Sequence, residues 1–192
     1  MSAYEILRLV LGPFGRPIGV LAARLRAQRT TRQFGSIGPD VVFGGDVRVD
    51  GGARITVGPG CRVMHGVTLW ATPRGSISIG SGTYLGDYTF VVSDAGIDIG
   101  ADVLIAPFCY LQDSDHGFAS VDQPMRDQPS VASRIVIEDD VWIGTHSVIT
   151  RGVRIGHGAV VGANSVVTHD VEPFAVVAGS PARMIRSRLD PS

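Results

Sequence analysis

The chain has 192 residues, a length that suits a single domain able to bury about two thirds of its unfolded surface. Its formal net charge of −1 gives no overall electrostatic reason to bind nucleic acid, and its two cysteines are too few for a disulfide framework. The 25 glycines and the aromatic content of 7% favour short strands and tight turns over a helical bundle.

Residues 1–36 are predicted to form a helical cap. Two apolar stretches, 6–11 and 18–25, flank the break GPFGRP, which is typical of a helix–loop–helix. Six arginines and one acid lie before residue 33, so peripheral contact with an anionic membrane is the alternative interpretation. No apolar run is long enough to span a bilayer and no signal peptide is recognisable, so we expect a cytoplasmic location.

Residues 37–172 contain a repeat. The first residues of successive units are aliphatic and lie 20, 22, 20, 38 and 18 residues apart. These spacings indicate a unit of 18 residues, with 2, 4, 2, 20 and 0 extra residues looped out between units. Each 18-residue unit divides into three hexads. The first residue of a hexad is aliphatic except at Phe43, and the fifth is Ala, Val, Ser, Thr or Cys except at Pro73 and Asp115. The opening residues of the units are Ile37, Val57, Ile79, Ile99, Ile137 and Ile155.

A period of six residues fits neither an amphipathic helix nor a plain alternating strand. It fits a chain that makes three short strands per turn, with successive turns stacked about 4.8 Å apart. The aliphatic residues would fill the interior of a three-sided prism, and the small residues would pack at its corners. The predicted fold is therefore an all-β solenoid of about six coils.

The stretch CYLQDSDHGF interrupts this pattern. The third hexad of the fourth unit ends at His116, and residues 117–136 form a predicted extruded loop that folds over this histidine before the repeat resumes. An imidazole has an ordinary pKa of about 6.5, which suits it to accept a proton near neutral pH. The alternative is a surface histidine at a turn. Asp113 and Asp115 would either orient the imidazole or form turns, and the turn role is favoured for each.

The hexads, and above all the stretch IEDDVWIGTHSVITRGVRIGHGAVVGANSVVTHDVEPFAVVAGSPARMIRSR, resemble the hexapeptide-repeat acyltransferases. The similarity is greatest to the branch of maltose, galactoside and polysaccharide O-acetyltransferases and covers about residues 37–188. It implies a left-handed parallel β-helix, a homotrimer with active sites between adjacent prisms, and acetyl-CoA as the acyl donor. It also implies direct acetyl transfer to a sugar hydroxyl of a glycan, glycolipid or nucleotide-sugar precursor, as in polysaccharide biosynthesis, with His116 as the general base.

The same resemblance implies a CoA site near the C-terminal end. Residues 173–192 are predicted to form a loop, a last strand and a short basic helix that carries PARMIR. The resemblance assigns different residues to four parts of CoA: the pantetheine arm, which backbone groups of its groove would contact, the nucleotide, the phosphates and the thioester end. The residues implied are Thr145 and Ala163 for the groove, Thr168 for the nucleotide, Arg183 and Arg186 for the phosphates, and Trp142 near the thioester or as a purely structural side chain.

The acceptor side matches the family less well. Asp87, Asp113 and Asp115 are the candidate acceptor-binding residues. The stretch LGDYTF lacks the asparagine that sugar acetyltransferases commonly place one coil before the histidine. RDQPS offers Asp127 and Gln128, without a clean match to the acid that often assists the base.

The sequence also bears on three other functions. A zinc carbonic anhydrase built on the same β-helix needs three converging imidazoles, whereas the five histidines here fall on different units, so no metal is expected. Cys61 and Cys109 occupy inward fifth positions, which disfavours a covalent cysteine intermediate. N-acylation of an amino-sugar nucleotide and a non-catalytic scaffold stay open as alternatives.

Overall fold

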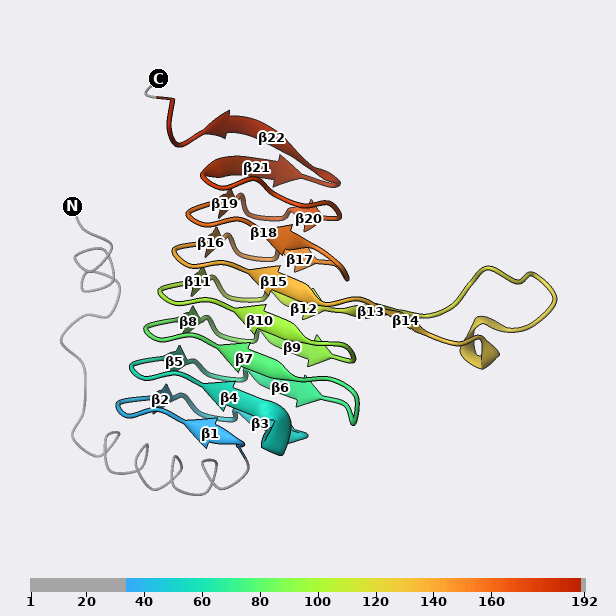
Figure 1. Cartoon of the computed structure of the whole chain (residues 1–192), viewed down its shortest axis with the longest axis horizontal. Helices are drawn as coiled ribbons and strands as arrows, with labels where there is room; N and C mark the ends of the chain where they lie inside the picture. The colour runs from blue at the N-terminus through green and yellow to red at the C-terminus, as the bar shows by residue number, and fades with distance from the viewer. Residues whose placement is uncertain (1–33, 191–192) are drawn as a thin grey trace.

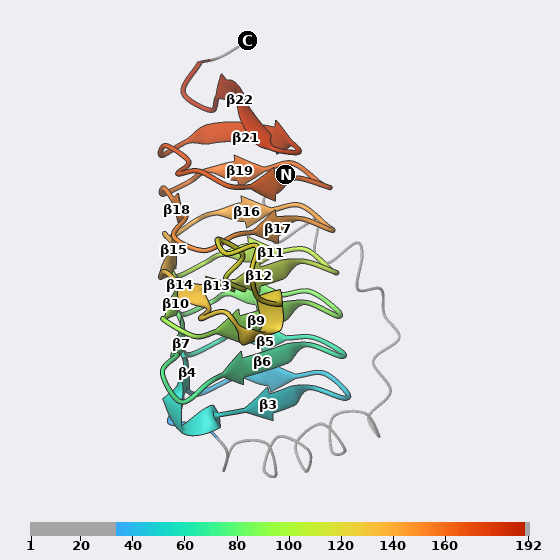
Figure 2. The ribbon, with the colours of Figure 1, turned by 90° about the vertical axis from the view of Figure 1, so that its right-hand side faces the viewer.

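A computed structural model describes residues 34–190 and shows a parallel all-β solenoid with three sheets around one core (Figures 1 and 2). Sheet A contains β1 (Ser36–Ile37), β4 (Ile55–Val57), β7 (Ile77–Ile79), β10 (Ile97–Ile99), β15 (Ile135–Ile137) and β18 (Arg154–Ile155). Sheet B contains β2 (Val42–Phe43), β5 (Arg62–Val63), β8 (Tyr84–Leu85), β11 (Leu104–Ile105), β16 (Trp142–Ile143), β19 (Val160–Val161), β21 (Ala175–Gly179) and β22 (Ala182–Ser187). Sheet C contains β3 (Arg48–Asp50), β6 (Thr68–Ala71), β9 (Phe90–Ser93), β12 (Tyr110–Gln112), β17 (Val148–Ile149) and β20 (Val166–Val167).

The hexad pattern describes the core. The aliphatic residues that open the hexads are buried in every coil after the first, and only Ile37 and Val49, at the open end, are partly exposed. The small residues of the fifth positions lie at the corners, where several bond the next coil. The Thr83 hydroxyl donates to the Gly100 carbonyl at 2.8 Å, for example. Stacking therefore buries the aliphatic side chains and satisfies the corner groups at the same time.

The corner between sheets B and C bends through one residue per coil with a positive φ. Aspartate, glycine or asparagine occupies this position at the ends of the stack, as such backbone geometry favours. In the middle it is occupied by Tyr88, Phe108 and His146, with φ of 56°, 63° and 59°. Their rings stack: the centroids of Tyr88 and Phe108 lie 5.4 Å apart, and those of Phe108 and His146 lie 4.9 Å apart. We call these three residues the corner ladder.

Two predictions about the C-terminal end are wrong. The chain makes about seven turns and not six, because Val171 bridges to Ile155 and β21 pairs with β19, which begins a further turn. The predicted short basic helix is strand β22, which runs antiparallel to β21. The turn after Gly179 sends the chain back along the last strand of sheet B, so that β22 covers an edge that would otherwise be unpaired.

The predicted N-terminal cap lies almost wholly outside the described residues, of which 34–36 are its only members. Strand β1 begins at Ser36, and a short 3-10 helix, η1 (Gly52–Arg54), follows β3. Among residues 34–190 no helix is long and apolar enough to cross a membrane.

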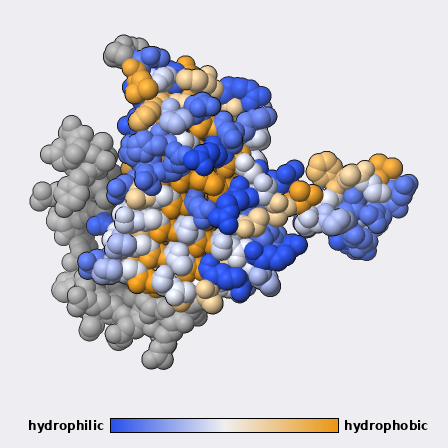
Figure 3. Space-filling model, in the orientation of Figure 1, coloured by the Kyte–Doolittle hydropathy of each residue, from blue (hydrophilic) through white to orange (hydrophobic). Residues whose placement is uncertain are grey.

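The predicted loop is a hairpin arm. Strands β13 (Ser114–Asp115) and β14 (Val131–Ala132) pair antiparallel at its base, and η2 (Met125–Asp127) lies near its end. The arm leaves the corner between sheets C and A and projects away from the prism (Figures 1 and 2). His116, at its start, is exposed, so the arm does not cover this histidine within the chain. Its surface mixes hydrophobic and hydrophilic side chains (Figure 3), and Phe118, Val121 and Met125 are exposed on it.

Candidate active site

His116 lies at the corner between sheets C and A, where the arm begins. Its ring is exposed and borders a pocket of about 190 Å³ on the outer face of sheet C. Strands β12 and β17 form the floor of the pocket, and the base of the arm forms one wall. The lining residues are Tyr110, Gln112, Ser114, Asp115, His116, Val148, Ile149 and Thr150.

The carboxylate of Asp113 is fully buried and is bonded to the coil below. It accepts backbone N–H bonds from Asp94 at 2.6 Å, Ala95 at 2.9 Å and Gly96 at 2.6 Å, and a hydroxyl bond from Ser93 at 2.8 Å. A buried carboxylate needs this number of donors to offset its lost hydration. Asp113 therefore holds the turn beneath His116.

Asp115 is exposed and binds Arg151 of the next coil, with 2.6 Å between the Nε of Arg151 and the carboxylate. A second bond, from the Ser133 N–H to the Asp113 carbonyl at 2.8 Å, closes the base of the arm. The Asp113 side chain thus bonds the coil below and the Asp115 side chain bonds the coil above, and with the Ser133–Asp113 backbone bond these contacts fix the segment that carries His116.

Asp94 is a polar residue of this corner that the sequence pattern did not single out. The Thr72 hydroxyl donates to its carboxylate at 2.6 Å. This bond, with a further one from the Ser114 side chain, lowers the pKa of Asp94 below its ordinary value of 3.8 despite partial burial. Aligning the third hexads of neighbouring coils places Asp94 one coil below Ser114, beneath the interrupted stretch, and this alignment is the signal that the sequence offers.

Thr145 and Ala163 stack on each other at the corner between sheets B and C. The Asn164 N–H donates to the Thr145 carbonyl at 2.9 Å, and the Thr145 hydroxyl donates to the Pro107 carbonyl at 2.6 Å. Asp87 lies at the same corner one coil below Phe108, and its carboxylate accepts the backbone N–H of His65 at 2.9 Å. These residues lie at the opposite edge of sheet C from His116, so within one chain the two groups are separated by the length of a strand.

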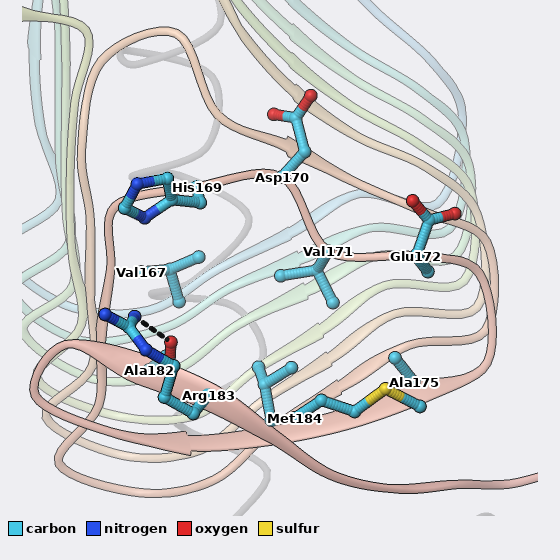
Figure 4. A pocket seen from close by; sticks show the side chains of 10 residues that line it. Val167, His169, Asp170, Val171, Glu172, Ala175, Ala182, Arg183 and Met184 are labelled. Carbon is cyan, nitrogen blue, oxygen red and sulfur yellow. Dashed lines mark hydrogen bonds between the residues drawn. The ribbon is translucent and has the colours of Figure 1, made fainter.

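A second pocket, which we call the upper pocket, lies near the C-terminal end of the stack. Thr168 directly follows β20, at the same edge of sheet C as His116 and next to two residues that line this pocket. This pocket, of about 330 Å³, lies beneath β22. Figure 4 shows His169 and Arg183 at one end of the pocket and Glu172 at the other. Arg186 is exposed further along β22. The complete lining is Val167, His169, Asp170, Val171, Glu172, Ala175, Val177, Ala182, Arg183 and Met184.

Trp142 is 53% exposed on the outer face of sheet B. Its neighbours in the register are Leu104 and Val160. It therefore lies on a different face from the pocket that His116 borders.

Both thiols are buried at corners. Cys61 donates to the Gly80 carbonyl at 3.0 Å and Cys109 to the Gly144 carbonyl at 3.2 Å. Burial raises the pKa of each thiol above its ordinary value, which disfavours the nucleophilic thiolate. Within residues 34–190, no three His, Cys, Asp or Glu side chains come together as metal ligands.

Comparison with known proteins gives consistent relatives. Residues 134–169 match the family model described as hexapeptide repeat of succinyl-transferase. The putative lipopolysaccharide biosynthesis O-acetyl transferase WbbJ of Escherichia coli K12 is 34% identical over 73% of this chain and 72% of its own. The probable acetyltransferase Rv3034c of Mycobacterium tuberculosis is 33% identical over 60% of this chain, which spans only 38% of that protein.

A solved structure is similar over most of this chain. The hexapeptide-repeat acetyltransferase VCA0836 of Vibrio cholerae, complexed with acetyl-CoA, superimposes with a TM-score of 0.66 and 33% identity. The match covers 87% of this chain and 78% of that one.

Proposed function

Because this chain belongs to the hexapeptide-repeat acyltransferase family, we propose that it transfers an acetyl group from acetyl-CoA to a hydroxyl of a sugar-containing acceptor. The observation that carries the proposal is the exposed imidazole of His116 beside a pocket at the one long interruption of the coils. The kinship with the O-acetyl transferase WbbJ supports a hydroxyl acceptor. The pocket is open to solvent, so a substrate can enter it.

The proposed chemistry is direct transfer. His116 removes the proton of the acceptor hydroxyl while the oxygen of that hydroxyl attacks the thioester carbonyl of acetyl-CoA. The tetrahedral intermediate collapses, the C–S bond breaks, and the imidazolium returns the proton to the sulfur of CoA. General-base catalysis of this kind contributes about 10²–10⁴ in rate. The buried, protonated state of both thiols supports transfer without a cysteine intermediate.

We further propose that the active site is completed by a second copy in a homotrimer of left-handed coils. Thr145 lies at the corner before β17 and Thr150 directly follows β17, so a strand of sheet C separates Thr145 from the His116 pocket of its own chain. An imidazole that accepts a proton from the attacking oxygen must lie within hydrogen-bond reach of it. In a cyclic ring, the corner with Thr145 and Ala163 of one copy would face the His116 pocket of the next, since each copy uses two different surfaces.

The corner ladder supports this arrangement, because its aromatic rings are exposed beside Thr145. Tyr88 is 45% exposed and Phe108 is 49% exposed. The CoA nucleotide would then lie towards the upper pocket, with Thr168 near the nucleotide and Arg183 and Arg186 near its phosphates. Guanidinium groups suit that task through paired hydrogen bonds.

The test is replacement of His116 by alanine. We expect kcat to fall about 10²- to 10⁴-fold while the Kd for CoA, measured by calorimetry, is unchanged. His157→Ala is the matched control, because this histidine is also exposed but lies at the corner between sheets A and B against Phe174. Unchanged turnover of H116A would remove the proposed role.

The acceptor class is tested by thiol release with acetyl-CoA and a panel of free sugars, nucleotide sugars, amino sugars and lipid-linked glycans. We expect release with hydroxyl acceptors. Activity on amines alone would make the protein an N-acyltransferase. Failure to bind CoA at all would favour a non-catalytic scaffold.

A further inference from the structure

The outer face of sheet C carries three exposed aromatic side chains on consecutive coils. Trp70 is 47%, Phe90 40% and Tyr110 38% exposed, on strands β6, β9 and β12. The register places Phe90 directly below Tyr110, with ring centroids 6.1 Å apart, and places Trp70 one coil lower in the neighbouring column, in line with Val92 and Gln112. We call Trp70, Phe90 and Tyr110 the aromatic strip.

The aromatic strip runs directly into the His116 pocket. Tyr110 is a member of both, and Gln112, its neighbour on the outer face, also lines the pocket. From β6 to β17 the strip and the pocket floor together span three coil steps, or about 14 Å, which is longer than one sugar ring.

We propose that the aromatic strip is an acceptor track that takes a linear saccharide of two or more sugar residues, with the reacting residue in the His116 pocket. The inference rests on the proposed function and adds the acceptor's size and its path. The saccharide runs along the stack of coils, so its next residues lie over Phe90 and Trp70.

The chemistry of the strip suits a saccharide. A pyranose presents a flat face of C–H groups and a rim of hydroxyls, so aromatic rings match its faces and polar groups match its rim. The Tyr110 hydroxyl donates to Oε1 of Gln112, which leaves the Tyr110 oxygen as an acceptor for a sugar hydroxyl. Nε2 of Gln112 donates to the Ser114 carbonyl at 2.9 Å and makes a longer contact of 3.5 Å with the Ser114 hydroxyl, so the amide is held in place beside the pocket.

A protein partner is the other occupant that exposed aromatic residues can have. Continuity with the pocket favours the saccharide.

Tryptophan fluorescence tests the track without relying on activity, because the chain contains only two tryptophans, Trp70 and Trp142. In W142F the sole reporter lies on the aromatic strip; in W70F it lies on sheet B. Both variants are titrated, at saturating CoA, with linear oligosaccharides of glucose and of N-acetylglucosamine of increasing length. We expect the emission of Trp70 to shift with the longer oligosaccharides and to become protected from acrylamide, while Trp142 does not respond to them.

Two results would overturn the inference. One is a Trp70 that responds to no saccharide. The other is a Trp70 already shielded from acrylamide before any saccharide is added, which would place a second copy of the chain on the strip.

Kinetics separate this inference from the proposed function. For Trp70→Ala and Phe90→Ala we expect kcat/KM to fall about two- to tenfold for a long acceptor and to stay unchanged for a single sugar. Leu104→Ala, an equally superficial change on sheet B, should affect neither. Equal rates for long and short acceptors in all variants would refute the track alone, whereas a wild-type protein that acetylates no sugar of any length would refute the proposed function.

Discussion

At the scale of single residues, the corner below His116 depends on one buried carboxylate. Asp113 accepts four hydrogen bonds, three of them from consecutive backbone N–H groups. In Asp113→Asn an NH2 group replaces one carboxylate oxygen, so a hydrogen-bond donor of the side chain points at backbone N–H groups that are themselves donors. We expect the variant to lose about 1–3 kcal/mol of unfolding free energy, measured by urea denaturation.

Asp115→Asn is the control for that change. Asp115 is exposed and its ion pair with Arg151 is a surface one, so the expected loss is below about 1 kcal/mol. Equal stability of D113N and the wild type would show that the buried carboxylate does not hold the turn.

Asp94 gives the same corner a dependence on pH. Its pKa in the folded protein is lowered, chiefly by the Thr72 hydroxyl, below the ordinary value of 3.8. The stability that this bond contributes is therefore fully present above pH 3.8 and is lost as the pH falls through the lower pKa of the folded state. We expect Thr72→Val to have a lower free energy of unfolding than the wild type at neutral pH, where the bond contributes fully, and therefore to unfold at a higher pH in an acid titration followed by circular dichroism. Coincident acid transitions would contradict this role of Thr72.

At the scale of elements, the sequence pattern identifies the inward side chains because stacking imposes the same requirement on every coil. Each hexad must supply one aliphatic residue to the interior and one small residue to a corner, so a single sequence displays the rule many times. The arm and β22 occur once each and show no such repetition. The segment ARMIRS is too short to separate a strand from a helix by its pattern, and the pairing with β21 decides its structure.

Strand β22 carries a prediction of its own. If Arg183 meets a phosphate of CoA beside the upper pocket, Arg183→Ala removes a charge-assisted bond. We expect the Kd for CoA to rise about 10- to 100-fold, with kcat at saturating acetyl-CoA nearly unchanged. The Kd for a pantetheine thioester that lacks the nucleotide should not change. An equal loss of affinity for both ligands would place Arg183 elsewhere in the mechanism.

At the scale of the whole molecule, the candidate site shows where prediction from the sequence ends. His116 was identifiable because it stands at an interruption along the chain. Tyr110 and Gln112 became recognisable as pocket residues only once the coils were stacked, since the pairing of β12 with β17 creates the floor of the pocket. The separation of Thr145 from His116 across sheet C likewise depends on which corner each residue occupies.

The division of the active site between copies is the central claim, and mixed assemblies test it most directly. His116→Ala removes the base and leaves the corner with Thr145 and Ala163 intact, whereas Ala163→Trp obstructs that exposed corner and leaves His116 intact. Each variant alone should be almost inactive. After the two are unfolded together at equal amounts and refolded, about a quarter of the sites would combine an intact base with an intact corner in a ring of random composition. We predict recovery of about a quarter of the wild-type rate of thiol release; no recovery, in assemblies shown to contain both variants, would contradict the shared site.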